Sequence, residues 1–417
     1  MGKLRSLRKQ YKMISPLKRL TIKLIIIIVI VVIFGGCKYL NPLLKPATDS
    51  SVQTTTQPPI QSTPQRTKPP IQVELLAVGD NLIHEPIYNE AKEITNNKGY
   101  DFGPAYSRVE DLIKKADIAF INQETPLGGT TLGISAYPHF NSPQELGDHM
   151  AAIGFDVINH ANNHILDKRE AGLKATLDFW KKYKDIKVIG AYATKEDSEK
   201  IQVIEKNGIR FSFIGFTYGT NGMFLKDDSN AVVQYITDEA IITHISEARK
   251  ISDIVVVSMH WGNEDQFVQS VEQKRLAGVI SAAGADVIIG HHPHVIQPIQ
   301  YIDKPEGGET LVVYSLGNFI SGQKGAANML GGLVSIVFEK IDNSKDPNLN
   351  LISITKVKFI PLVTHYNNKF RDLAIYPFSD YTRELASLHG CVKYDNSFSY
   401  DYLQSIITKT ILPEFLK

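Results

Sequence analysis

The chain has 417 residues, of which 43% are hydrophobic and 21% are charged, so it is long and apolar enough to bury a sizeable core. Residues 1–36 hold eight of the 45 lysines and arginines and no acid, which leaves 37 basic and 44 acidic residues in the rest of the chain. A mildly acidic body lacks the excess of basic residues that binds nucleic acid, and this disfavours nucleic acid as a partner.

The basic N-terminal segment is followed by an apolar run of eleven residues, Leu24–Phe34, and then by two glycines and Cys37. As a helix this run would rise ~16 Å, against the ~30 Å of a bilayer's hydrocarbon core, which is typical of a signal peptide. Small residues before Cys37 resemble the lipobox of bacterial lipoproteins, in which the cysteine is lipidated. The alternative for residues 1–37 is an uncleaved anchor. Both interpretations attach the N-terminus to the cytoplasmic membrane and place the body on its extracellular side.

Residues 38–71 are predicted to form a disordered linker, because threonine, proline, glutamine and serine dominate the segment from residue 45 on and leave little to bury. One large domain is expected over residues 72–366. Residues 367–417 are expected to form a C-terminal extension that packs on it.

From residue 72 onward, apolar runs of strand length alternate with amphipathic helical stretches, which predicts an α/β fold whose sheet is buried on both faces. The predicted strands are 73–80, 116–124, 155–164, 187–191, 210–218, 253–262, 285–292 and 310–318. The predicted helices are 104–115, 143–153, 168–184, 238–251 and 267–283. After Gly331 two further strands follow without a helix between them and are expected to be antiparallel.

Most of the predicted strands end in polar residues, and ligand sites of open α/β sheets gather at the carboxyl ends of strands. These residues are Asp80, Asn122, Glu124, Asn163, His164, His260, His292, His294 and Asn318. Of these, Asn122 and Asn318 are candidate substrate-binding residues. Glu264, four residues after His260, is either a third such residue or a solvated acid.

The stretch "GHHPH" gives the strongest indication of a metal. His292 and His294 flank Pro293, which favours an extended backbone that turns both rings towards one ion. Histidines combined with carboxylates and an amide oxygen suit Mn, Fe or Zn, and we expect one or two divalent metals. A zinc site of cysteines is excluded, because Cys391 is the only cysteine besides Cys37.

The stretch "NNHILD" suggests acid–base chemistry beside these ligands. Asn163 could offer its amide oxygen to a metal, while His164 could donate a proton to a leaving group. Asp167 could hold the His164 ring in one tautomer. The alternative is an asparagine-rich turn without chemistry. His160 alternates to the other face and is expected to be structural.

The order of these motifs resembles the CapA/PgsA capsule-synthesis family, a branch of the calcineurin-like metallophosphoesterases. The motifs are Asp, Asn-x-Glu, Asn-Asn-His-x-x-Asp, His and Gly-His-His-Pro-His, joined by "YSLGNFI" at 314–320. The resemblance covers about residues 73–365 and implies a four-layer αββα sandwich. It also implies metal ligands at Asp80, Glu124, Asn163, His260, His292 and His294, with His164 near the leaving group. Leu82 stands where the superfamily's first motif has a ligand histidine, so the site holds a single metal or a weakly bound second one.

The resemblance implies a role in making or exporting poly-γ-glutamate or a similar capsule polymer. The leading hypothesis is an exported, membrane-attached protein with a metal-dependent, hydrolase-like site. The alternatives are a non-catalytic assembly or transport subunit and a polymer-binding module. Expected partners are the anionic capsule polymer or its synthase subunits.

Overall fold

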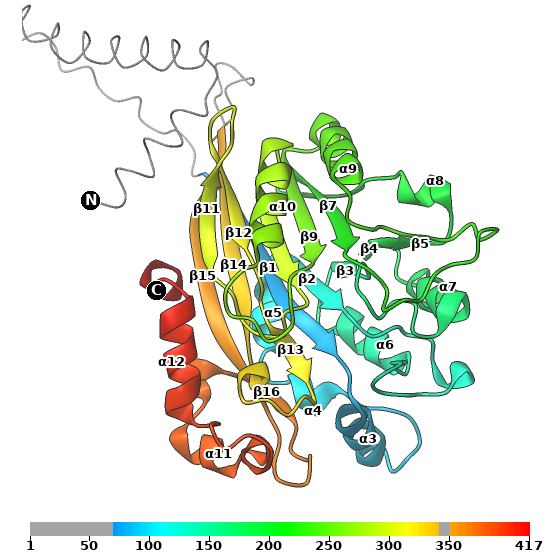
Figure 1. Cartoon of the computed structure of the whole chain (residues 1–417), viewed down its shortest axis with the longest axis vertical. Helices are drawn as coiled ribbons and strands as arrows, with labels where there is room; N and C mark the ends of the chain where they lie inside the picture. Colours follow the sequence, from blue (N-terminus) through cyan, green and yellow to red (C-terminus); the bar gives the residue numbers. More distant parts are fainter. Residues whose placement is uncertain (1–69, 342–350) are drawn as a thin grey trace, which may run out of the picture. The chain divides into compact units, whose positions relative to one another are not determined.

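The computed structural model describes residues 70–341 and 351–417 (Figure 1). The predictions for residues 1–37, including lipidation of Cys37, and for nearly all of the linker lie outside the described residues. Within the described ranges no helix is both long and apolar enough to cross a membrane.

Two mixed β-sheets form the centre of the domain. The strand order of the first sheet is β16-β15-β14-β1-β2-β3-β4, with β13 paired to β1. Its strands are β1 (Ile71–Leu82), β2 (Ile118–Gln123), β3 (Val157–Asn159), β4 (Lys187–Ile189), β13 (Asn318–Ser321), β14 (Leu330–Ile341), β15 (Leu351–His365) and β16 (Ala374–Pro377). The strand order of the second sheet is β11-β12-β10-β9-β7-β6. Its strands are β6 (Gln202–Lys206), β7 (Ile209–Thr217), β9 (Ile254–His260), β10 (Val287–His291), β11 (Ile299–Asp303) and β12 (Glu309–Val313). A small ribbon pairs β5 (Ala191–Tyr192) with β8 (Val232–Val233).

Aromatic side chains join the two sheets across the central core. The rings of Phe120 on β2 and Phe213 on β7 stack at 6.4 Å, and those of Phe211 and Phe338 meet edge to face at 5.1 Å. All four are buried, so each sheet covers the inner face of the other.

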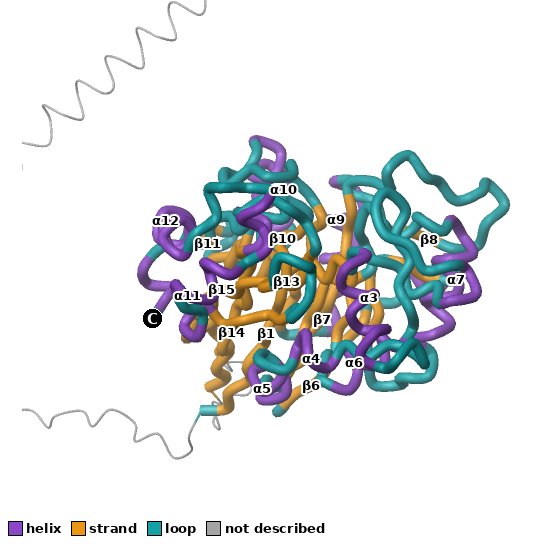
Figure 2. The backbone as a smooth tube through the Cα atoms, turned by 90° about the horizontal axis from the view of Figure 1, so that it is seen from below, coloured by secondary structure: helices purple, strands orange, loops and turns teal. Residues whose placement is uncertain are grey.

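Helices cover the outer faces of both sheets, as Figure 2 shows. Helices α9 (Asp238–Ile251) and α10 (Val271–Ala282) bury Ile241, Ile245 and Leu276 against the second sheet. On the other side, the Tyr106 hydroxyl at the end of α4 (Gly103–Tyr106) donates to Asn81 Oδ1 at 2.6 Å. The remaining helices are α3 (Glu85–Ile94), α5 (Glu110–Lys115), α6 (Glu145–Ala152), α7 (Arg169–Trp180), α8 (Lys195–Ser198), α11 (Arg383–Leu388) and α12 (Tyr400–Thr410). The predicted four-layer αββα sandwich is confirmed.

Several predicted elements differ from the structure, and three of them have a clear local cause or consequence. The strand expected over 155–164 ends at Asn159, because Asn159 Oδ1 accepts the backbone N–H of Ala161 and starts a turn. The helix expected from residue 267 begins at Val271, where Ser270 and Gln273 form a capping box. The strand expected over 310–318 is divided between β12 of one sheet and β13 of the other.

The register of the parallel strands brings their polar ends together. Asp80 on β1 lies opposite Asn122 on β2 and Asn318 on β13. In the second sheet His260 on β9 lies opposite His291 on β10. Except for Asn318, which begins β13, these residues lie at or near the carboxyl ends of their strands, where the two sheets jointly form the candidate site.

Candidate metal centre

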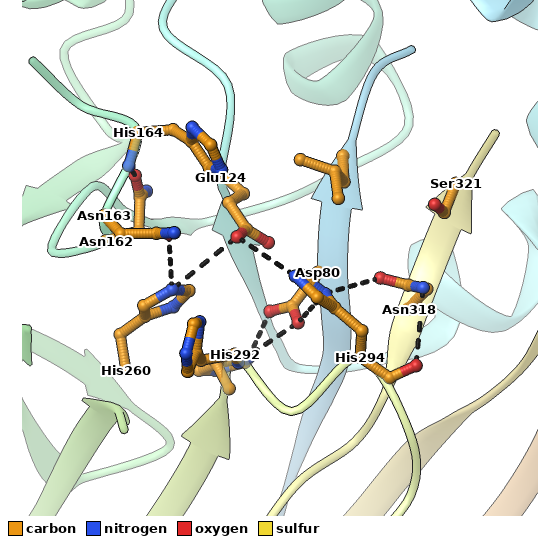
Figure 3. A network of polar contacts seen from close by, with 12 residues as sticks. Asp80, Glu124, Asn162, Asn163, His164, His260, His292, His294, Asn318 and Ser321 are labelled. Carbon is orange, nitrogen blue, oxygen red and sulfur yellow. Dashed lines mark hydrogen bonds and ion pairs between the residues drawn. The ribbon is translucent and has the colours of Figure 1, made fainter. Parts of the chain in front are cut away.

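The predicted ligands come from both sheets and converge on one buried cluster (Figure 3). Asp80 lies in β1, and Glu124 directly follows β2. Asn163 and His164 lie in the turn after β3, and His260 ends β9. The remaining two, His292 and His294, follow β10.

Asp80 is fully buried and has partners on both carboxylate oxygens. His291 Nδ1 lies 3.3 Å from Oδ1, and His294 Nδ1 lies 3.2 Å from Oδ2. The Asn122 amide donates to Oδ1 at 2.7 Å, and the backbone N–H of His292 donates to Oδ2 at 3.2 Å. Burial disfavours the charged form, but hydrogen bonds and charge from His291 and His294 hold the pKa of Asp80 well below its usual range. Asp80 is therefore ionised in the folded protein.

Gly79 allows β1 to approach the chain before β13. A Cβ on Gly79 would lie 2.0 Å from the carbonyl oxygen of Gly317, a distance that no side chain tolerates. The backbone N–H of Asp80 donates to that same carbonyl at 2.9 Å. The Gly-Asp sequence therefore fixes where the carboxylate enters the cluster.

Glu124 is fully buried, and neither of its oxygens has a hydrogen-bond partner. Oε1 lies 3.6 Å from His260 Nε2 and 3.8 Å from His294 Nε2, and Figure 3 shows Glu124 between these two rings. Burial, followed by repulsion from Asp80, raises the pKa of Glu124 well above its usual range. Buried carboxylates without partners are costly, whereas a cation at this place would satisfy both oxygens.

His260 and His292 are held as neutral rings. Burial lowers the pKa of His260 well below its usual range and that of His292 to about 3. His260 Nε2 lies 2.8 Å from the amide oxygen of Asn163, and His292 Nδ1 has no hydrogen-bond partner. Neutral imidazoles are the form that binds metals.

His294 is the exception, because two acids surround it. Burial opposes its charged form, yet the negative charges of Glu124 and Asp80 raise the pKa of His294 to about 10. In the metal-free protein the His294 ring therefore acts as the cation of the cluster. Metal binding would displace that proton, since a ligating histidine must be neutral.

The cluster contains three groups of three side chains each. Within each group, every side chain offers one ligand atom, and these atoms lie within 4.8 Å of one another. They are Glu124 with His260 and His292; Asp80 with Glu124 and His294; and Glu264 with His292 and His294. Glu124 belongs to the first two groups, which is the position of a bridging carboxylate. This set of nitrogen and oxygen ligands, with two unpartnered carboxylate oxygens at its centre, fits one or two divalent metals.

The backbone around Pro293 is not extended, contrary to the prediction. His292 has φ 94° and His294 has φ 57°, both in the left-handed region that side chains other than glycine rarely adopt. Each such residue costs about 1–3 kcal/mol, and such strain concentrates at functional sites. The tight conformation keeps the two ring centroids 5.9 Å apart.

His164 and Asp167 form the pair expected from the sequence. His164 Nδ1 lies 2.7 Å from Asp167 Oδ2, which also accepts the backbone N–H of Phe140 at 2.7 Å. The Phe140 ring packs edge-on against His164, with centroids 4.7 Å apart. Because Nδ1 faces Asp167, Nε2 is the nitrogen left to exchange a proton with a substrate.

The three candidate substrate-binding residues differ in placement. Asn122 is fully buried beneath Asp80, where its position suits orienting that carboxylate. Asn318 Oδ1 lies 3.0 Å from His294 Nδ1, so Asn318 orients a ligand ring in the same way. Glu264 alone is exposed at the site.

Two further histidines, of which only His160 was the subject of a prediction, do not join the ligand set. His160 is buried and accepts the Trp180 indole N–H at 2.8 Å, which agrees with a structural residue. His291 lies behind Asp80 and stacks on Phe120 at 5.9 Å.

Sequence reasoning missed the segment that follows β7. The Tyr218 ring lies 4.6 Å from the His292 ring, and the Asn221 amide oxygen accepts from Asn163 at 3.4 Å. The stretch "YGTNG" could have indicated this segment, because it follows a predicted strand whose end lies at the same sheet edge as the ligands.

The support of this edge from the C-terminal residues was also missed. The Tyr366 hydroxyl donates to the carbonyl of Gln323 at 3.2 Å, and Asp395 Oδ2 accepts the backbone N–H of Ala326 at 2.8 Å. Gln323 in turn accepts from Asn318 at 2.7 Å, which connects these residues to His294. Nothing in the sequence pattern indicated this connection.

We expect Glu124→Gln to stabilise the metal-free protein. Replacing a buried carboxylate that accepts no hydrogen bond should raise the free energy of unfolding by about 1–3 kcal/mol at pH 8. The gain should shrink towards pH 5, because a carboxyl whose pKa is raised by folding contributes stability at low pH that is lost as the pH rises. Denaturant unfolding of chelator-treated protein measures this. Glu264→Gln, at an exposed acid, is the control and should change little. A destabilised Glu124→Gln variant would contradict the description of Glu124 as a buried carboxylate whose oxygens accept no hydrogen bond.

Solved structures that are similar to this chain include a phosphatase and a nucleotidase. The first is a novel phosphatase from Mycoplasma pneumoniae, with a TM-score of 0.42 at 13% identity, covering 70% of this chain and 94% of the other. The other is a 5'-nucleotidase precursor from Thermus thermophilus, with a TM-score of 0.41 at 15% identity, covering 70% of this chain and 54% of the other.

Sequence comparison identifies curated relatives. The chain is 34% identical over 235 residues to the PGA biosynthesis protein CapA of Bacillus subtilis (strain 168), covering 56% of this chain and 60% of that protein. It is 29% identical over 262 residues to the capsule biosynthesis protein CapA of Bacillus anthracis, covering 60% of each. The chain thus matches well under two thirds of the length of these relatives.

The family model described as bacterial capsule synthesis protein PGA_cap matches residues 74–323. This range contains every predicted metal ligand together with His164 and Asp167. The resemblance drawn from the motifs is therefore confirmed, and the chain belongs to the PGA_cap family of bacterial capsule synthesis proteins.

Proposed function

We propose that this protein is exported, attached to the membrane, and acts in capsule or poly-γ-glutamate biosynthesis or export through a metal-dependent, hydrolase-like site. The observation that carries the metal is Glu124, a fully buried carboxylate with two unpartnered oxygens between histidine rings. The observation that favours chemistry is the His164–Asp167 pair, because a purely structural metal site has no use for a proton donor.

The metal ligands in this proposal are Asp80, Glu124, Asn163, His260, His292 and His294. A divalent metal bound there supplies Lewis-acid stabilisation of negative charge that develops on a phosphoester or amide. The chain's own part is to orient and to move a proton. His164 Nε2 donates a proton to the leaving group, while Asp167 stabilises the charged ring through Nδ1.

A non-catalytic assembly or transport subunit is the second candidate. Leu82 favours it, because this side chain is 2% exposed and offers no ligand atom where the superfamily motif has a histidine. In that case a metal would only hold together the edge where the two sheets meet, and His164 would be dispensable.

Polymer output of cells tests whether the centre matters. Cells whose own copy is replaced by the double variant His292→Ala/His294→Ala should produce little polymer compared with cells that carry the wild-type chain. Polymer would be quantified after extraction, with the amount of protein checked by immunoblot. Normal output from a metal-free double variant would contradict the proposed function.

The location at the membrane is proposed from Cys37 and the apolar run before it. We expect the protein in the membrane fraction and sensitive to protease added outside the cell. Cys37→Ala should abolish lipid labelling and leave a longer, uncleaved chain. A variant that fractionates and migrates like the wild-type chain would favour the uncleaved anchor.

A further inference from the structure

Tyr218 is a half-exposed side chain beside two histidines of the candidate metal centre. It directly follows β7, whose last residue, Thr217, lies opposite His260. Its ring is parallel to that of His260, at 8° and 6.2 Å, and lies 4.6 Å from the ring of His292. With 49% of its surface exposed, Tyr218 is reachable from solvent while it touches two predicted ligands.

The hydroxyl of Tyr218 lies beside Asn163, whose side chain offsets part of the rise that burial causes in the pKa of Tyr218. The Asn163 amide oxygen faces His260 Nε2 at 2.8 Å and its NH₂ group donates to Asn221 at 3.4 Å, so Asn163 has no free acceptor for the phenol. Among the described residues, none is seen to accept the phenolic proton. The O–H is therefore available to donate to a bound molecule.

The predicted ligands include acids, so a hydrogen-bond donor beside them would help to stabilise a bound anion. Among the described residues, no hydrogen bond or ion pair recorded for the predicted ligands involves a lysine or arginine. The candidate ligand groups also contain three acids, Asp80, Glu124 and Glu264. A preorganised neutral donor such as the phenolic O–H would stabilise an anionic oxygen that binds beside these acids.

We propose that Tyr218 is a substrate-contacting residue whose phenolic O–H donates a hydrogen bond to an anionic oxygen of the group bound at the metal centre. This inference rests on the proposed function, since it requires the metal. The ring keeps the neighbouring histidines packed, and the hydroxyl recognises the substrate. Tyr218→Phe separates these two tasks, because it removes only the hydroxyl.

The experiment uses the purified full-length chain loaded with Mn²⁺ and inorganic phosphate as the probe. Bound manganese is measured by elemental analysis, and phosphate affinity by calorimetric titration. Tyr218→Phe should keep the manganese content of the wild-type chain and bind phosphate about 10-fold more weakly or worse, as expected when a hydrogen bond to a charged group is lost. Tyr301→Phe is the matched control, since this tyrosine lies on β11 and contacts Phe415. It should change neither quantity.

Three results would overturn the inference, and they differ from a failure of the proposed function. Unchanged phosphate affinity in manganese-loaded Tyr218→Phe would show that the hydroxyl does not contact the anion. Loss of manganese from Tyr218→Phe would make Tyr218 a support of the ligands. Wild-type protein that holds manganese but not phosphate would remove the anion site while the metal centre stands. Wild-type protein that binds no manganese would refute the proposed function itself, and the inference with it.

Discussion

The double variant His292→Ala/His294→Ala is expected to bind Mn²⁺ at least about 100-fold more weakly than the wild-type chain. Loss of a group that merely orients a ligand already costs about 10–100-fold in metal affinity, and this variant lacks two ligands. Every one of the three ligand groups found in the cluster contains His292 or His294. No group of three remains intact, so the affinity should fall at each metal position. Titration of both proteins with Mn²⁺ measures this affinity.

The matched control is a second buried pair of histidines. His365 and His389 pack edge to face at 5.0 Å, where the C-terminal residues meet β15, and neither belongs to a ligand group. Their replacement by alanine should lower stability through lost packing but leave the metal content per folded molecule unchanged. If the control loses as much metal as the test variant, the loss reports damage to the fold and the assignment of the ligands is wrong.

His164→Asn is expected to keep the fold and the metal and to lose activity by about 10²–10⁴-fold. The side chain lies beside the ligands and is absent from all three ligand groups, so metal content is an internal control. Asp167→Asn should give a smaller loss, because Asp167 acts through the ring of His164. Polymer output per cell, measured together with bound metal, gives the activity of each variant.

His139→Asn provides the comparison for this variant. His139 is exposed on the loop that carries Phe140, so the same substitution is made near the site but outside it. It should leave polymer output unchanged. Normal output from a metal-replete His164→Asn protein would contradict the catalytic role and favour the assembly subunit.

The convergence of the ligands was predictable from the sequence for a simple physical reason. Parallel strands that alternate with helices all end at the same edge of their sheet, so polar residues at those ends must lie close together. Asp80, Glu124 and His260 follow this rule directly. The family resemblance then supplied the expected division of the strands into two facing sheets.

The partners of individual side chains were not predictable in the same way. Asn122 lies near the end of β2 and Asn318 begins β13, and hydrogen bonds turn the two side chains towards Asp80 and His294. Strand periodicity states which face a residue occupies but not which neighbour it meets. Substrate binding by Asn122 and Asn318 therefore stays a prediction, to which the structure adds a hydrogen bond from each residue to a predicted ligand.

The conformation of the loops was the other feature that could not be predicted from the sequence. The path around Pro293 depends on the left-handed residues on both sides of it, which the proline itself does not dictate. Tyr218 was counted as the end of a strand, because the turn that aims its ring at His292 has no periodic pattern. Local sequence gives the register along a strand, while tertiary packing sets the course of the loops.

Elemental analysis of the purified wild-type chain, prepared without chelators, tests the central claim most directly. The unpartnered oxygens of Glu124 and the neutral rings of His260 and His292 lead us to expect between one and two equivalents of Mn, Fe or Zn per chain. Protein that is folded, contains no transition metal, and takes up none from added Mn²⁺ would contradict the metal centre and the function proposed from it.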